Sequence, residues 1–350
     1  MSTSTLPYSH ITTIATTLSN GTSDPATGYD DIPLYLSIIY GIIAAMSIIG
    51  NGLIIMVILY NRNILANPTN MLIFTLAIVD CLTGIVMFFT PSLVIRIRYY
   101  PFPSGYPGGP IFCHLIDSFY IFFSLGNLSV MLVMLISIER WTAIARATKY
   151  RQWFALSRVK VFIALVIIIV CILNLDNLLG KVYDPAVFPP CQWRPIFPQR
   201  SQNLTLFLVF EILRLFLPVT IIILCYLDIA KRTIFSSKVG GVFIEQSVKY
   251  TARRRVTITC FVSSSVLVAC WLPNEIYFTL MNFNTISYSF VIHGITKTLI
   301  IFNSCANPFI YAATNRSYRR HILQFVFGKR GDHKSHLHRP SSNINTSHNR

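Results

Sequence analysis

The sequence predicts an all-α membrane protein whose core is a bundle of seven transmembrane helices. Composition is the first reason: of the 350 residues, 53% are hydrophobic and only 12% are charged, roughly half of the ~25% charged residues usual in soluble domains. The second reason is that several separate stretches approach the ~20 apolar residues needed to cross a bilayer. The chain is therefore expected to lie in a lipid membrane.

The first span is the clearest, because no charged residue stands between Asp31 and Arg62. Six further apolar stretches follow it and bring the number of spans to seven. They are expected at about residues 67–95, 110–141, 158–180, 203–232, 250–280 and 289–313. The bundle as a whole is expected within residues 33–313.

Two of these spans are weaker than the others. The fourth is uncharged only over residues 161–175, so Lys160 must extend to the membrane surface or Asp176 must face protein. The fifth reaches full length only by taking Glu211 and Arg214 into the membrane.

The distribution of lysine and arginine predicts the orientation. Residues 1–32 contain none, so they are expected to form a polar extracellular tail. With that end outside, the inner segments hold all but seven of the 29 basic residues. The seven are Arg96, Arg98, Lys181, Arg194, Arg200, Arg214 and Lys297. The net charge of +16 is then mostly cytoplasmic, where it attracts anionic membrane lipids, and it gives no support to nucleic-acid binding.

The cysteines divide between the membrane and the outer side on this topology. Six fall within spans, where a cysteine is by default a small buried apolar residue. Only Cys113 and Cys191 lie at the oxidising outer side, so a disulfide between them is the natural pairing. Asn20, in the sequence Asn-Gly-Thr, is the expected glycosylation site in the outer tail.

Several spans carry polar side chains, which are costly inside a membrane and are therefore functional candidates. The second span has one charged residue, Asp80, and oxygen-bearing side chains on three other spans can lie at the same depth. These are Asn51, Ser129, Asn303, Ser304 and Asn307. Such a group suits a small hard cation or a water network, and it can equally be a hydrogen-bonded cluster that only fixes helix packing.

Prolines form a second pattern. Pro218, Pro273 and Pro308 lie inside the fifth, sixth and seventh spans, where each removes a backbone hydrogen bond and permits a kink. Such kinks are either static features of shape or places where half a helix can swing.

Six short motifs occur in order, each on its own span or just after the last one. They are IIGNGLII, LAIVD, SIERWTAI, CWLP, NSCANPFIY and NRSYRRHILQF. Together they make the chain resemble a rhodopsin-like (class A) G-protein-coupled receptor of the neuropeptide type over about residues 33–328. The resemblance implies a multi-pass plasma-membrane protein and a short amphipathic helix at 314–328 on the inner membrane surface.

The resemblance assigns the polar and aromatic positions. Glu139 is expected to hold Arg140 at rest, and activation then frees this arginine to meet a heterotrimeric G protein, although the pair can also be a simple interfacial anchor. The resemblance implies further activation residues: Tyr226, Pro273, Asn307, Pro308 and Tyr311. It also implies a sodium site at Asp80, Ser129, Asn303, Ser304 and Asn307, with no other cofactor.

Two departures from the family pattern carry consequences. Arg253 stands where the family commonly has an acid that bridges to the third-span arginine, which hints at some ligand-independent activity. Cys113 lies 27 residues before Arg140, about two more than usual, so an irregular outer end is expected for the third span.

The ligand is inferred from the outer half of the bundle. Phe122 stands where amine receptors have an aspartate and Ile301 where opsins have a lysine, which argues against an amine and against retinal. The expected pocket is two-signed and aromatic, and its residues are Phe122, Phe123, Glu211, Arg214, Trp271, Glu275, Tyr277 and Lys297. It best suits a short peptide. A lipid or small acid recognised by Lys297 or Arg214 is the alternative, and Glu211 and Arg214 can also simply pair with each other.

Other classes of function fit less well. A transporter usually shows internal repeats with broken helices, and none is evident. An enzyme needs a nucleophile–base or metal constellation, and the nearest candidate, HKSHLH, lies in residues 329–350, which are expected to form a disordered cytoplasmic tail. Serines and threonines of that tail either recruit arrestin when phosphorylated or stay unmodified.

Overall fold

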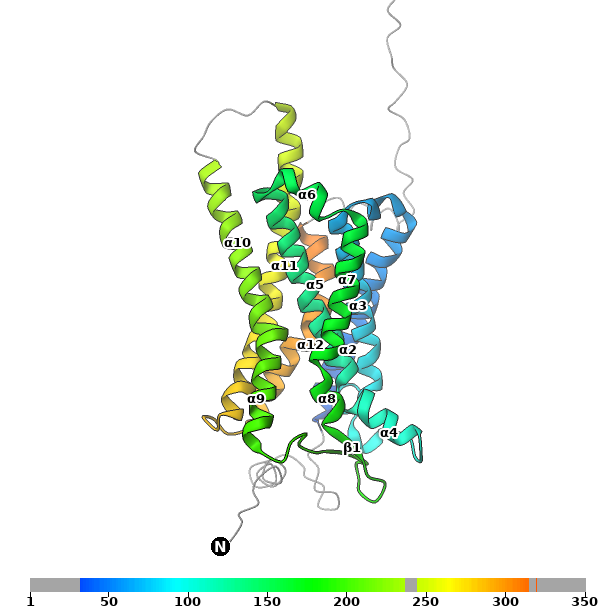
Figure 1. The fold of residues 1–350 in the computed structure, drawn as a ribbon. Helices are drawn as coiled ribbons and strands as arrows, with labels where there is room; N and C mark the ends of the chain where they lie inside the picture. The colour runs from blue at the N-terminus through cyan, green and yellow to red at the C-terminus, as the bar shows by residue number, and fades with distance from the viewer. Residues whose placement is uncertain (1–31, 237–243, 315–318, 320–350) are drawn as a thin grey trace, which may run out of the picture.

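The computed structural model describes residues 32–236, 244–314 and 319, and in this part of the chain seven long helical segments stand side by side (Figure 1). In chain order these segments are α2 (Leu34–Tyr60), α3 (Pro68–Phe89), α5 (Tyr120–Ala145), α7 (Leu156–Leu173), α9 (Arg200–Glu211) continued by the π-helical turn η4 (Ile212–Phe216) and α10 (Leu217–Ser236), α11 (Ile244–Asn282) and α12 (Phe290–Thr314). The seven-helix bundle predicted from the sequence is confirmed.

Short elements close the two ends of the bundle. One end, called the hairpin end below, carries η2 (Ile97–Tyr99), α4 (Gly108–Phe112), the π-helical turn η3 (Cys113–Asp117), α8 (Leu175–Leu179), and the strands β1 (Lys181–Tyr183) and β2 (Cys191–Trp193). The strands are antiparallel, with Val182 opposite Gln192. The predicted disulfide between Cys113 and Cys191 is present and ties the hairpin to η3. The opposite end carries η1 (Arg62–Ala66) and α6 (Ala147–Trp153).

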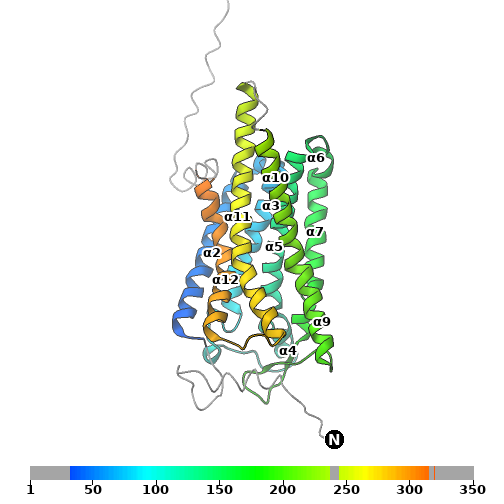
Figure 2. The same cartoon turned by 90° about the vertical axis from the view of Figure 1, so that its left-hand side faces the viewer.

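Six of the helical segments described are long and apolar enough to cross a membrane by themselves. They are Leu34–Tyr60, Pro68–Phe89, Gly108–Ala145, Leu156–Leu179, Arg200–Thr233 and Arg254–Asn282. The remaining helix, α12, carries polar residues such as His293, Asn303 and Asn307, which lower its mean hydropathy. It nevertheless runs the length of the bundle beside α2 and α11 in both views (Figures 1 and 2). Its polar side chains are buried against protein, so α12 does not have to be apolar on every face.

The third span is irregular at the hairpin end of the bundle, as its length predicted. The π-helical turn η3 absorbs extra residues, and Phe119 then adopts a left-handed backbone conformation with φ of 61° that separates η3 from α5. Ser118 stabilises the junction, since its hydroxyl accepts a hydrogen bond from the Tyr120 backbone N–H at 3.1 Å.

Prolines shape three of the helices. The turn η4 immediately precedes Pro218, whose missing N–H cannot complete a regular helical hydrogen bond. Pro273 and Pro308 lie inside α11 and α12. A Cβ at Gly50 of α2 would lie 2.9 Å from the Pro308 ring, so the glycine permits this close approach of α2 and α12.

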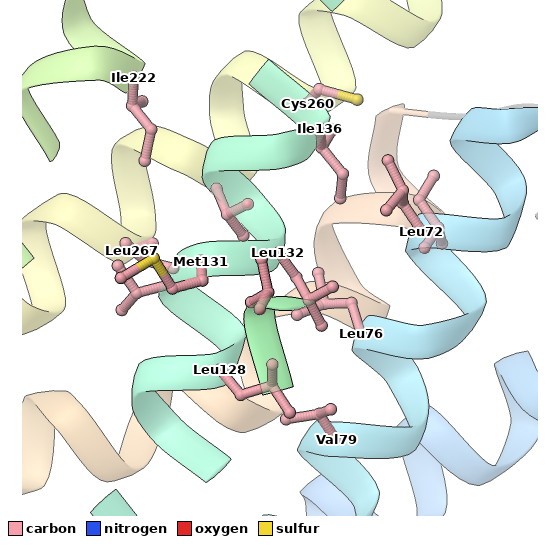
Figure 3. Close-up of a cluster of buried hydrophobic side chains, with 14 of the residues drawn as sticks. Leu72, Leu76, Val79, Leu128, Met131, Leu132, Ile136, Ile222, Cys260 and Leu267 are labelled. Carbon is pink, nitrogen blue, oxygen red and sulfur yellow. The ribbon is translucent and has the colours of Figure 1, made fainter. Parts of the chain in front are cut away.

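The hydrophobic core is centred on α5. Figure 3 shows side chains from α3, α5, α10 and α11 meeting at this helix. Those labelled there are Leu72, Leu76, Val79, Leu128, Met131, Leu132, Ile136, Ile222, Cys260 and Leu267. By contrast, α7 contacts the bundle through few buried residues and exposes Leu165, Ile168 and Ile172 on its other side. Apolar residues on both faces are what a helix between protein and lipid requires.

Several predictions fall outside the described residues. These are the extracellular tail with Asn20, the amphipathic helix at 314–328 apart from Thr314 and Arg319, the tail at 329–350, and the side chain of Arg253.

Candidate functional site

A cavity of about 130 Å³ lies within the bundle, on the side of the hairpin end. Its walls come from α5, the continuous segment α9–η4, and α11. The lining residues are Phe123, Asn127, Asn177, Phe207, Glu211, Arg214, Leu215, Trp271, Asn274, Glu275 and Phe278. Five of the eight predicted ligand residues are therefore brought together: Phe123, Glu211, Arg214, Trp271 and Glu275. The volume of the cavity is below the roughly 300–1,000 Å³ of typical ligand sites.

A single guanidinium organises the charges of this cavity. Arg214 Nε donates to Glu211 Oε1 at 2.7 Å, and another Arg214 nitrogen lies 2.6 Å from the same oxygen. Arg214 also donates to both carboxylate oxygens of Asp176 at 3.2 Å. Glu211 and Arg214 therefore pair with each other, and Asp176 faces protein, which is one of the two outcomes expected for the fourth span. The π turn η4 contains Arg214 and so sets the direction in which its side chain leaves the helix.

Acidic groups outnumber basic ones around this guanidinium. Glu275 of α11 interacts electrostatically with both Glu211 and Arg214, so three carboxyl groups surround one cation. Glu211, Arg214 and Glu275 are 4%, 7% and 8% exposed, which means that water screens them little. Among the described residues, Glu211 Oε2 accepts from no N–H or hydroxyl donor, and the carboxyl group of Glu275 lies within hydrogen-bond distance of Glu211. Two buried carboxyl groups side by side are costly, and a cation entering the cavity would pair with both.

Trp271 belongs to the same wall and is packed against α5. A Cβ on Gly126 would lie 2.7 Å from the Trp271 ring, so the glycine is what allows the indole to approach this helix so closely. The indole N–H is buried and has no acceptor among the described residues.

The other three predicted ligand residues do not line the cavity. Phe122 leaves α5 in a different direction from Phe123, because neighbouring residues on a helix point about 100° apart. It packs against α2, α3 and α12. The Tyr277 hydroxyl accepts the Ser289 N–H at 2.7 Å and fastens the start of α12. Lys297 Nζ lies 5.2 Å from the centre of the Phe119 ring, away from the carboxylate cluster.

Six lining residues were not predicted from the sequence: Asn127, Asn177, Phe207, Leu215, Asn274 and Phe278. Helical spacing from a predicted residue was the signal that could have found three of them. Phe207 precedes Glu211 by four residues, Asn127 follows Phe123 by four, and Phe278 follows Glu275 by three, so each shares a helix face with a predicted cavity residue. Asn177, on the short helix α8, carries no such signal.

The β-hairpin is held over this end of the bundle by a buried ion pair as well as by the disulfide. Lys181 of β1 donates to the Asp117 carboxylate of η3, and its Nζ also lies 4.9 Å from the centre of the Trp193 ring on β2. A cation between a carboxylate and an aromatic face is well compensated for its burial. The hairpin is thus fixed to η3 by two independent links.

A second polar network occupies the opposite end of the bundle. Arg140 donates to both carboxylate oxygens of its neighbour Glu139 and to the Thr69 hydroxyl. Thr69 in turn donates to Glu139 at 3.1 Å, and the Tyr150 hydroxyl of α6 donates to Glu139 at 2.5 Å. Burial, followed by the neighbouring Glu139 carboxylate, raises the pKa of the Tyr150 phenol above its usual range, so its hydroxyl stays protonated and remains a donor. Arg140 is therefore held in a closed local network.

The sequence of residues 50–311 matches the family described as 7 transmembrane receptor (rhodopsin family). That match covers most of the chain and agrees with the bundle and with the network at Arg140. The chain belongs to this receptor family. The resemblance drawn from the sequence motifs is confirmed.

Named relatives share about three residues in ten with the receptor. It is 29% identical over 302 residues to neuropeptides B/W receptor type 1 of Mus musculus, an alignment that covers 83% of the receptor and 85% of the relative. It is 28% identical over 334 residues to neuropeptides B/W receptor type 2 of Homo sapiens, covering 88% and 91%. It is 27% identical over 326 residues to somatostatin receptor type 2 of Mus musculus, covering 86% and 81%.

Two of the predicted activation residues of the receptor, Tyr226 and Tyr311, lie in its hydrophobic core. The Tyr226 hydroxyl lies 3.5 Å from Ser264 Oγ and is buried, and Tyr311 is buried in the same core. Trp141, the residue after Arg140, donates its indole N–H to Asp228 of α10 at 2.7 Å. That hydrogen bond ties α5 to α10 beside the arginine and was not predicted from the sequence.

The predicted sodium residues of the receptor are partly brought together. Asp80 is 1% exposed, and its two carboxylate oxygens accept hydrogen bonds from Ser129 at 3.2 Å and from the Asn307 amide at 2.7 Å. The Ser304 hydroxyl is directed to its own helix, where it donates to Ile301 O at 2.8 Å. A buried carboxylate with only neutral donors fits a hard monovalent cation, with Asp80 and Ser129 as the oxygen ligands. Bound sodium would neutralise the Asp80 charge.

Proposed function

We propose that this receptor binds a short extracellular peptide through a cationic group of the peptide and then activates a heterotrimeric G protein. The observation that carries the proposal is the imbalance of charge in the cavity, where Asp176, Glu211 and Glu275 surround the single cation Arg214. A basic side chain or a free amino terminus would complete this cluster. The printed names of the relatives, receptors for neuropeptides B/W and for somatostatin, support a peptide as the ligand class.

The proposed orientation places the hairpin end outside the cell, in the plasma membrane. Residues 1–31 contain no lysine or arginine, whereas the segments joining helices at the opposite end include Arg62, Arg146, Lys149 and Arg151. Basic residues near transmembrane ends favour the cytoplasmic side. The cavity then opens towards extracellular ligands and the Arg140 network faces the cytoplasm.

The route from ligand to G protein follows from the contacts. The cation of the peptide pairs with the carboxyl groups of Glu211 and Glu275, and so links the α9–α10 segment to α11. Trp271 lies in the same wall, two residues before Pro273 in the same turn of α11, so a shift there changes the angle of α11. Release of Arg140 from Glu139 then exposes a guanidinium to the G protein.

An acidic ligand is the second candidate, and one observation favours it. Lys297 has no carboxylate partner among the described residues; its contacts there are the Phe119 ring and Ser92 O, which Nζ approaches to 3.4 Å. Arg214 is a weaker anchor for an acid than expected from the sequence, because two carboxylates already hold it.

The proposal that the protein acts as a receptor also includes a sodium ion at Asp80 and binding of arrestin to the phosphorylated tail.

The test expresses the receptor in cells with a broadly coupling G protein and applies pools of short peptides. Each pool has a matched twin in which lysine is replaced by norleucine and arginine by citrulline. Separate pools contain lipids, amines and small acids. We expect a response to the basic peptides that their uncharged twins lack.

Receptor variants locate the contact. Glu211→Gln should lower the potency of an active peptide about tenfold to a hundredfold, because a lost charge-assisted hydrogen bond is worth about 1.5–3 kcal/mol. Lys297→Gln is the matched control and should leave that potency unchanged. Arg140→Ala should abolish signalling with surface expression preserved. Activity only with acids, lost in Lys297→Gln, would establish the second candidate instead.

A further inference from the structure

A groove on the side of the bundle lies between α10 and α11, which run next to each other in Figure 2. Its volume is about 720 Å³, within the roughly 300–1,000 Å³ of typical ligand sites. Residues of both helices line it, among them Ile223, Leu227, Phe261, Val268, Leu272 and Ile276. It shares no lining residue with the cavity around Arg214. Leu227 and Phe261 are 54% and 50% exposed, so the groove opens on the outside of the bundle, where lipid surrounds a membrane protein.

The described lining of the groove is almost entirely apolar. Its hydroxyl groups are bonded within the protein: Ser265 Oγ donates to Phe261 O at 2.9 Å, Ser264 Oγ donates to Cys260 O at 2.9 Å, and the Tyr226 hydroxyl lies 3.5 Å from Ser264 Oγ. Serines that bond back to the preceding turn have little capacity left for a ligand. The groove therefore suits a hydrocarbon chain.

Basic residues continue both walls of the groove towards the Arg140 end. On α11, Arg254 precedes Phe261 by two turns and lies on the same helix face. On α10, Lys231 follows Leu227 by four residues and shares its face in the same way. Both side chains are exposed. The neighbouring Asp228 is already occupied by Arg232, at 2.7 Å, and by Trp141.

We propose that this groove binds one acyl chain of an anionic phospholipid, with the phosphate of the headgroup between Lys231 and Arg254. The proposal rests on the orientation given above, which places these two residues at the inner leaflet, where anionic lipids are concentrated. Between Phe261 and Ile276 the groove follows α11 for about 22 Å at 1.5 Å per residue. One leaflet of hydrocarbon is about 15 Å thick, so a chain of ordinary length fits along the groove.

The occupant would touch two residues with proposed roles in activation. Tyr226 and Pro273 both line the groove, and a chain lying there fills the space between α10 and α11 at the level of the proline. The lipid would thus bind a surface whose shape depends on how α10 and α11 are placed relative to each other.

The test uses photoreactive lipids and requires neither an agonist nor a G protein, so it is independent of the proposed peptide function. The full-length receptor is placed in lipid nanodiscs that contain phosphatidylserine or phosphatidylcholine with the same diazirine-bearing acyl chain. After illumination, mass spectrometry locates the labelled peptides. We expect phosphatidylserine to label residues 222–230 and 261–276 far more than phosphatidylcholine does.

Two sets of variants separate the headgroup from the chain. Lys231→Gln with Arg254→Gln should reduce phosphatidylserine labelling of the groove by up to about 30-fold, since each basic residue near an anionic surface contributes about fivefold. Lys160→Gln, an exposed basic residue of α7, is the matched control and should change nothing. Ala269→Trp should block the groove and remove labelling by both lipids. Equal labelling of the groove by the two lipids, or none by either, would overturn the proposal.

Discussion

Asp176, Glu211 and Glu275 with Arg214 are called the carboxylate cluster. Removing its positive charge should destabilise the receptor, whereas removing one negative charge should leave the stability unchanged or raise it. Arg214 lies 2.6 Å from Glu211 and 3.2 Å from Asp176, and all three side chains are largely buried. Arg214→Met leaves these carboxylates next to Glu275 without a cation. Removing one partner of a buried pair costs about 3–5 kcal/mol, and at roughly 2 °C per kcal/mol for a chain of this size we expect Tm to fall by about 6–10 °C.

Glu211→Gln is the matched comparison, because it removes one of the surplus carboxylates and keeps an oxygen that can accept from Arg214. The Asp176 pair remains intact. We therefore expect Tm of the ligand-free receptor to stay the same or to rise, while peptide potency falls. Such a trade of affinity for stability is common at binding sites.

Thermal unfolding of the purified receptor in one detergent, followed by a thiol-reactive fluorescent dye, measures both variants side by side. The protein should be free of ligand and at low salt, where charge effects are largest. Equal losses of Tm in the two variants would show that shape and not charge dominates the cluster. If the Tm of Arg214→Met equals that of the wild type, charge pairing does not stabilise this cluster and the prediction is wrong.

Three further predictions concern other parts of the receptor. Tyr150→Phe removes a donor from Glu139, so basal G-protein signalling should rise a few-fold, and unchanged basal activity would contradict this role. Asp80→Asn should abolish any effect of sodium on agonist affinity, whereas wild-type affinity that never responds to sodium would leave only a packing network. Cys113→Ser should lower the free energy of unfolding by about 2–4 kcal/mol and reduce agonist binding, while Cys171→Ser, a free and exposed cysteine, should match wild type.

The sequence predicted the bundle well because a membrane imposes a simple rule on each span. Long apolar stretches must cross the bilayer as helices, since no water is present to satisfy backbone groups there. The same reasoning found the disulfide, because only two cysteines lay at the outer side. Spacing alone also indicated the irregular end of the third span, where η3 and Phe119 absorb the extra residues.

The sequence was less informative about which side chains share a site. In a soluble helix a polar face marks the surface, but α5 and α7 are apolar on nearly every side, so periodicity does not tell which face is buried. Phe122 and Phe123 were therefore assigned to one pocket although only Phe123 lines the cavity. Lys297 was grouped with the carboxylates by its depth, and the structure directs it to Phe119 instead.

The sequence by itself determined that this chain is a seven-helix membrane receptor, which residues form the disulfide, and where the activation motifs lie. Only the tertiary structure decided that Asp176, Glu211 and Glu275 surround one guanidinium, and that Tyr150 and Thr69 close the network at Arg140. The physical reason is that these groups come from different helices. Their meeting depends on the rotation of each helix about its own axis, which side-chain packing sets and hydropathy does not reveal.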